Sequence, residues 1–214
     1  RGAGAHRRSA GPVSGRSVRT VLGRIAYGLV AFVVLLGTVS LGIRLKTYAD
    51  DVDAAQRPFA VQADPGEPAY GRTFVATALE VRGAGAIRDS GVDHTTNGVW
   101  LIVKVRLAAL DEPVGVGYVA LRDAAGRVYL ASNRIDQPLV RYRTLQPNLP
   151  VVGEFAFEVP RDVAGSPTVL LAESVELRMD TMLELRLEPL SPETVKKWAD
   201  DPQPARLMAT ELAA

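Results

Sequence analysis

Cysteine is absent from the 214-residue sequence, and histidine occurs only as His6 and His94. Without a thiol the chain can form no disulfide, no thiolate metal site and no cysteine nucleophile. Two histidines are too few for a multi-histidine metal centre. Aromatic residues make up only 6%, but hydrophobic residues reach 47% and charged residues 23%. This balance is typical of a globular protein, so we expect one folded domain with little room for a second.

Acidic residues are missing from residues 1–24, which contain six arginines. Since the whole chain carries +1, subtracting these six charges leaves a net charge of −5 on residues 25–214. The excess of positive charge is therefore confined to a basic tail. Because the acidic remainder would repel phosphate groups, we expect no binding of nucleic acid.

One long apolar run stands alone in the chain. Residues 25–43 read IAYGLVAFVVLLGTVSLGI and contain no charged side chain. As a helix this run would be ~28 Å long, close to the ~30 Å hydrocarbon layer of a bilayer. It predicts a transmembrane helix with residues 1–24 in the cytoplasm and the rest of the chain outside. A cleaved signal peptide is the alternative, but Arg44 and Lys46 follow the run where small residues would mark a cleavage site.

Small residues in this run form a patch where another helix can approach closely. They are Gly37, Thr38 and Gly42, with Thr38 and Gly42 four positions apart. We name these three as candidate helix-packing residues. The next segment, residues 44–68, contains Pro58, Pro65 and Pro68 and is predicted to be an extracytoplasmic linker or stalk.

From about residue 72 apolar and polar residues alternate, as in strands that are half buried against a core. The strongest strand is Val99–Leu107, with Val99, Leu101, Val103, Val105 and Leu107 on its inward face and Trp100, Ile102, Lys104 and Arg106 on its outward face. Further strands are predicted at 73–82, 114–122, 127–131, 151–159, 169–177 and 182–188. In the first of these, we expect Val75, Thr77, Leu79 and Val81 to face the core. In the last, we expect Leu183, Leu185 and Leu187 to face the core and Glu184, Arg186 and Glu188 to face outward. About seven short strands predict a mainly β fold, an antiparallel immunoglobulin-like sandwich over residues 69–190, with a small barrel as the alternative.

The C-terminal part, residues 191–214, is predicted to be a short helical tail. Ser191 followed by Pro192 has the form of a helix start, and we expect this helix to run to about residue 199. Two segments are candidate partner contacts. Trp100 and Ile102 are large and apolar on the outward face of their strand, so the C-terminal tail, a partner or a curl of the same sheet must cover them. The second segment is Arg141, Tyr142 and Arg143, residue types that are favoured in binding hot spots.

Few residues in this sequence are of the types that carry out catalysis. His94 is the one imidazole after the apolar run, and no G-x-S-x-G motif is present, so a serine hydrolase mechanism lacks its usual parts. Asp89, Asp93 and His94 gather in one loop and are candidate ligands for a cation, although their spacing matches no EF-hand or zinc pattern. We therefore expect no enzymatic activity and no cofactor.

Several of these positions occur together in a known family. The stretch GVWLIVKVRLAALDEPVGVGYVALRDAAGRVYLAS, followed by TLQPNLPVVGEFAFEVP, resembles the immunoglobulin-like (telokin-like) DUF4352 extracytoplasmic domains of bacterial surface proteins. The matching positions are Val99–Leu107, Leu121, Asp123, Gly126, Tyr129, Leu145, Pro147, Gly153, Phe157 and Pro160. The similarity covers about residues 72–190, but Ala109 stands where the family often has Asn, and Asn148 where it often has Gly. The resemblance implies a sandwich behind a membrane anchor, without a shared catalytic site.

Together these features predict a single-pass membrane protein with its C-terminal domain outside the cell membrane. We expect it to contact the lipid bilayer and another membrane or envelope protein, as a non-catalytic accessory or protein-binding subunit of a bacterial cell-envelope complex. A ligand- or cation-binding sensor or carrier at the cell surface is the alternative, and a cell-wall hydrolase is a third.

Overall fold

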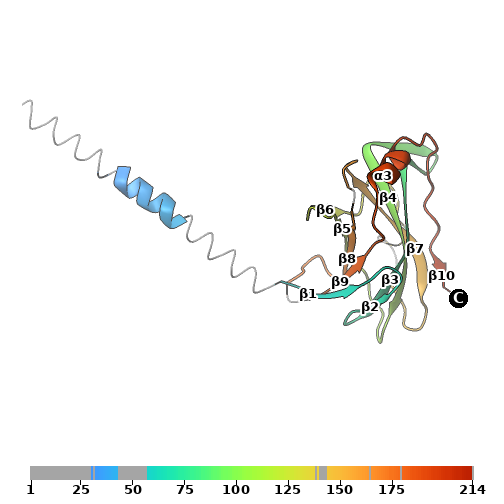
Figure 1. Cartoon of the computed structure of the whole chain (residues 1–214). Coiled ribbons are helices and arrows are strands. Elements are labelled where there is room, and N and C mark those ends of the chain that lie inside the picture. Colours follow the sequence, from blue (N-terminus) through green and yellow to red (C-terminus); the bar gives the residue numbers. More distant parts are fainter. Residues whose placement is uncertain are drawn as a thin grey trace, which may run out of the picture. The chain divides into compact units, whose positions relative to one another are not determined.

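The computed structural model describes residues 30, 32–42, 57–137, 139, 144–163, 165–178 and 180–213. They fall into two units, residues 1–55 and 56–214. In the first unit residues 32–42 are helical (Figure 1, blue), and their apolar side chains, such as Phe32 and Leu35, are exposed. The predicted span 25–43 lies partly outside the described residues. Within those that are described, no helix combines the length and the apolar character needed to cross a membrane.

The second unit is a sandwich of two five-stranded sheets, so the predicted fold is confirmed at this level (Figure 1). The first sheet has the order β1-β9-β8-β5-β6. Its strands are β1 (Phe59–Ala63), β5 (Tyr118–Arg122), β6 (Val128–Leu130), β8 (Thr168–Ala172) and β9 (Thr181–Arg186). The second has the order β10-β7-β4-β3-β2. Its strands are β2 (Pro68–Tyr70), β3 (Phe74–Asp89), β4 (Val92–Ala109), β7 (Val151–Val159) and β10 (Glu211–Leu212). All pairs are antiparallel except β1 with β9.

The described residues contain ten strands rather than about seven, because short edge strands were not predicted. Residues 59–63 and 68–70 belong to the sheets, so the predicted linker is wrong in its second half. The prolines there do not prevent strand formation, because Pro58 precedes β1 and Pro68 is the first residue of the edge strand β2. Pro65 and Gly66 lie in the turn between them, where Gly66 has a φ of +80°.

The core between the sheets follows the predicted pattern in β4. Its five predicted inward residues, Val99, Leu101, Val103, Val105 and Leu107, are at most 1% exposed. Across the core, Leu183 and Leu185 of β9 are also buried, as predicted. Burial of these branched side chains supplies the main driving force for folding, at about 25 cal/mol per Å² of apolar surface.

The C-terminal tail begins with the predicted helix, α3 (Pro192–Ala199). Ser191 caps it by accepting a hydrogen bond from the backbone N–H of Thr194 at 3.1 Å, and Val195 is buried in the core. After the helix, the chain crosses the outer face of the second sheet. There the backbone N–H of Ala205 donates to Ala86 O at 2.9 Å, and Arg88 N–H donates to Ala205 O at 2.7 Å.

This crossing segment covers Trp100 and Ile102, which are 0% exposed. They pack in an apolar cluster outside the second sheet with Ile87, Ile135 and Ala156, against Ala205 and Leu207. The indole N–H of Trp100 donates to His94 O at 2.8 Å. Of the expected coverings, the structure shows the C-terminal tail, through Leu207, so Trp100 and Ile102 offer no surface to a partner in this conformation.

Candidate functional site

The first part of strand β3 presents Phe74 and two alanines to the core, and Val75, Thr77 and Leu79 to the outside. Phe74, Ala76 and Ala78 are at most 4% exposed, whereas Leu79 is 46% exposed. The prediction that Val75, Thr77 and Leu79 face the core is therefore wrong by one residue. A register shift between Ala78 and Glu80 then exchanges the inward and outward positions of the strand. Val81 therefore packs against the core as predicted.

The outward residues of β3 form the floor of an open groove with the outer faces of β2 and β4. Tyr70 pairs with Val75, which pairs with Ala108, so these three form one row across the strands. Pro68, Thr77 and Arg106 form the next row. The groove has a volume of about 460 Å³. Its lining residues are Gly66, Pro68, Tyr70, Val75, Thr77, Leu79, Arg106, Leu107, Ala108 and Pro150. Tyr70 is 62% exposed, so a large aromatic ring lies open to solvent at this site.

Arg106 is the cationic group of this groove. Its neighbours in register are Thr77 on β3 and Val152 on β7, neither of which carries a charge. In the described part of the chain, its guanidinium has neither an ion pair nor a hydrogen bond. Arg82, on the same sheet, is different, because it binds Glu154 through contacts of 2.9 to 3.2 Å. The groove thus combines exposed apolar side chains with an unpaired guanidinium.

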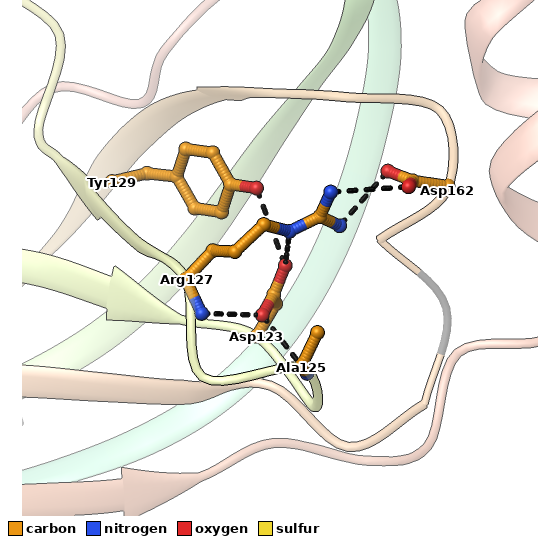
Figure 2. Close-up of polar contacts among 5 residues, drawn as sticks. All are labelled: Asp123, Ala125, Arg127, Tyr129 and Asp162. Carbon is orange, nitrogen blue, oxygen red and sulfur yellow. Dashed lines mark hydrogen bonds and ion pairs between the residues drawn. The ribbon is translucent and has the colours of Figure 1, made fainter.

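A cluster at the β5–β6 turn surrounds the carboxylate of Asp123 with donors from its own hairpin (Figure 2). Asp123 accepts from the backbone N–H groups of Ala125 and Arg127 at 3.0 and 2.8 Å, from Arg127 Nε at 2.6 Å and from the Tyr129 hydroxyl at 3.2 Å. Arg127 also binds Asp162 at 2.9 and 3.1 Å. Burial would raise the pKa of Asp123, but the hydrogen bonds and charge of Arg127 outweigh it and hold that pKa below its ordinary value.

This cluster explains part of the sequence pattern noted above. Asp123 closes the turn, Gly126 adopts a φ of +83°, and Tyr129 reaches back to the carboxylate. Both oxygens of Asp123 are occupied by donors from its own hairpin, so we assign the cluster a structural role in the hairpin.

The predicted cation ligands do not converge. Asp93 forms two hydrogen bonds of 2.5 and 2.7 Å with Arg88, which hold the pKa of Asp93 below its ordinary value. Asp89 instead accepts from the backbone N–H of Asp136 at 2.9 Å. Among the residues that the structure describes, no three carboxylate or imidazole side chains gather as a metal site would require. Asp89, Asp93 and His94 therefore do not form a cation site in this conformation.

The other predicted contacts lie outside this unit or outside the described residues. Arg141, Tyr142 and Arg143 are not among the residues described. Gly37 and Gly42 lie on the helix of residues 32–42, where an added Cβ atom would meet nothing within 4 Å. Thr38 donates its hydroxyl to Leu35 O at 2.8 Å. The packing of this helix against another one stays a prediction.

Sequence reasoning missed the groove because it predicted no strand at Tyr70 and assigned Val75 and Leu79 to the core. The signal was nevertheless present in β3, where alanines alternate with larger apolar residues. Such a strand can be placed with either face inward, and the larger residues were taken as the buried ones. Arg106 was correctly predicted to face outward.

No protein-family model matches the chain, and no curated protein matches it. Among solved structures, it is similar to an uncharacterized β-sandwich protein from Clostridium difficile 630, with a TM-score of 0.40 and 9% sequence identity. The match covers 62% of this chain and 97% of that one.

Proposed function

We propose that the chain is a membrane-anchored extracytoplasmic sandwich that binds a partner protein without catalysis, as an accessory subunit of a bacterial envelope complex. The observation that carries this proposal is the exposure of Tyr70 and Leu79 beside Arg106 in one groove. Soluble domains rarely expose several large apolar side chains along one groove unless the surface serves an interaction. Tyrosine and arginine are also enriched among the residues that dominate binding energy.

The anchor part of the proposal rests on the composition of residues 1–43. An uncharged run of nineteen residues follows a tail with six arginines, the charge distribution of a span with its N-terminus inside. Anchoring would restrict the sandwich to the membrane surface and raise its effective concentration toward membrane neighbours. We also propose that the sandwich is an immunoglobulin-like domain of the DUF4352 type, since Asp123, Gly126 and Tyr129 of the shared pattern cooperate in one turn.

Site-specific photo-crosslinking in intact cells tests the groove. A benzophenone amino acid is placed at Tyr70 or Leu79 of the full chain, and at Val175 as a control. Val175 is 76% exposed, in the segment between β8 and β9 of the other sheet. We expect a discrete adduct with an envelope protein from the groove positions and none from Val175. Adducts from all three positions alike, or from none, would count against the groove as a binding site.

A second experiment tests the anchor. Val33→Arg and Leu36→Arg place charges within the apolar run, at a cost to membrane insertion of about 2.5–3.5 kcal/mol each. Val33→Leu and Leu36→Val are the matched controls. We expect the double Arg variant to leave the membrane fraction, while the control stays and is digested by protease added to intact cells. A control chain found in the soluble fraction would contradict the anchor.

A further inference from the structure

We infer that the groove recognises a partner segment in which a carboxylate lies next to apolar side chains, and that Arg106 binds this carboxylate. The inference rests on the proposed function, because it names the chemistry of the partner at the same groove. It starts from the guanidinium itself. This group carries five N–H donors in a planar fork that matches a carboxylate with two parallel hydrogen bonds. In Arg106 no protein group in the described part of the chain uses them.

The neighbours of Arg106 leave its guanidinium open to an incoming group. In its row across the sheet, Thr77 lies on one side and Val152 on the other, both with short side chains. Continuing the row past Val152, the first carboxylate is that of Glu211 on β10, two strands away. Since neighbouring strands are ~4.8 Å apart, Glu211 is roughly 10 Å from Arg106 in the plane of the sheet. In the described part of the chain Arg106 makes no ion pair with Glu211 or with any other carboxylate, so its charge is available to a carboxylate of a partner.

The other carboxylates of this face do not pair with Arg106 in the part of the chain that the structure describes. Glu154 is bound by Arg82 and by the backbone N–H of Met208 at 2.7 Å, which fixes it under the C-terminal segment. Glu80 is in register with Lys104, two residues before Arg106 on β4. The groove therefore presents a positive charge to a partner, and opposite charge on the partner would favour encounter and orientation.

The row of Tyr70, Val75 and Ala108 sets a second requirement for the partner segment, which is an apolar side chain. Ala108 follows Arg106 by two residues on β4, and it lies in the row of Val75 and Tyr70. Same-face positions two residues apart on a strand are ~7 Å apart. A partner segment that fills both rows must therefore hold a carboxylate and an apolar side chain at about this spacing. Residues i and i+2 of an extended segment meet this requirement.

Peptide selection on the full chain in lipid nanodiscs tests the inference. A phage library of random linear 12-residue peptides is the probe, and it is selected separately on the wild type, Arg106→Gln and Arg106→Glu. We expect wild-type binders to share Asp or Glu two positions from an apolar residue. Measured by fluorescence anisotropy, Arg106→Gln should weaken them by about tenfold or more, and Arg106→Glu should select Lys or Arg instead.

Two matched variants separate the possible failures. Arg206→Gln removes an arginine that has no ion pair in the described residues and does not line the groove, and it should leave affinity unchanged. Tyr70→Ser removes the exposed ring of the groove. If binders lack an acid and tolerate Arg106→Gln but lose affinity with Tyr70→Ser, the inference fails while the proposed function stands. If no peptide is selected, or if binders ignore Tyr70→Ser as well, both fail. Unfolding curves of each variant confirm that the sandwich is intact.

Discussion

Arg122 of β5 and Glu184 of β9 pair through two hydrogen bonds of 3.0 and 2.8 Å, although strand β8 lies between their strands. The pair lies on the outer face of the first sheet, yet Glu184 is only 5% exposed. Leu170 of β8, in register with Glu184 on the same face, is 3% exposed. Gln62 of β1 adds a third hydrogen bond to Glu184 at 3.1 Å. These contacts connect β1, β9 and β5 above β8.

A double-mutant cycle should show strong coupling between the two charged residues. Arg122→Ala or Glu184→Ala alone should lower the free energy of unfolding by about 1–3 kcal/mol. The first leaves the buried Glu184 carboxylate with only its bond from Gln62, and the second leaves the half-buried Arg122 guanidinium unpaired. The double variant should lose less than the sum, with a coupling of roughly 0.5–3 kcal/mol in urea unfolding. Arg178→Ala is the control, since its pair with Glu176 is 3.6 Å long and exposed, and it should cost less than about 1 kcal/mol. Strictly additive losses at Arg122 and Glu184 would contradict the role given to this pair.

The same pair predicts how stability depends on pH. Hydrogen bonds from Arg122 hold the pKa of Glu184 below its ordinary value of 4.5, against the opposing effect of burial. A carboxyl whose folded pKa is depressed stabilises the fold fully above its unfolded pKa, and this stabilisation is lost as pH falls through the folded value. The wild type should therefore exceed Glu184→Gln in unfolding free energy at about pH 6, and the difference should shrink toward about pH 3. A difference that stays constant over this range would show that ionisation of Glu184 does not stabilise the sandwich.

Strands β4 and β3 differ in how clearly their sequences specify which face is buried. In β4 every second residue is a large aliphatic one, and only one phase buries all of them, so its inward face is predicted correctly. In β3 both phases are apolar, and tertiary packing decides between Ala76 and Val75. The outward position of Glu184 was also predicted, but its burial depends on Arg122, which is 62 positions away in sequence. Pairings of this kind arise from strand order, which local alternation does not specify.

At Gly98 the backbone of β4 lies so close to that of β7 that we expect only glycine to fit there. An added Cβ atom would overlap the backbone carbonyl oxygen of Val159, which cannot move without disturbing the strand. Gly98→Ala should therefore lower the free energy of unfolding by about 2 kcal/mol or more, in line with overpacking of a well-packed site. Gly115→Ala is the matched control, because a Cβ there meets nothing within 4 Å. Thermal unfolding of the two variants measures the difference, and equal midpoints would refute this account of the β4–β7 contact.

In the turn cluster of Figure 2, one arginine pairs with two carboxylates, one buried and one exposed. The side chain of Asp123 is 2% exposed and that of Asp162 is 69% exposed, and both pair with Arg127. Asp123→Ala removes the acceptor of two backbone N–H groups and of the Tyr129 hydroxyl, so we expect it to cost about 1–3 kcal/mol. Asp162→Ala removes a solvated ion pair and should cost less than about 1 kcal/mol. Urea unfolding compares the two variants. If Asp162→Ala proved the more damaging, the hairpin would depend on the bridge from Arg127 to Asp162, and the structural role assigned to Asp123 would be wrong.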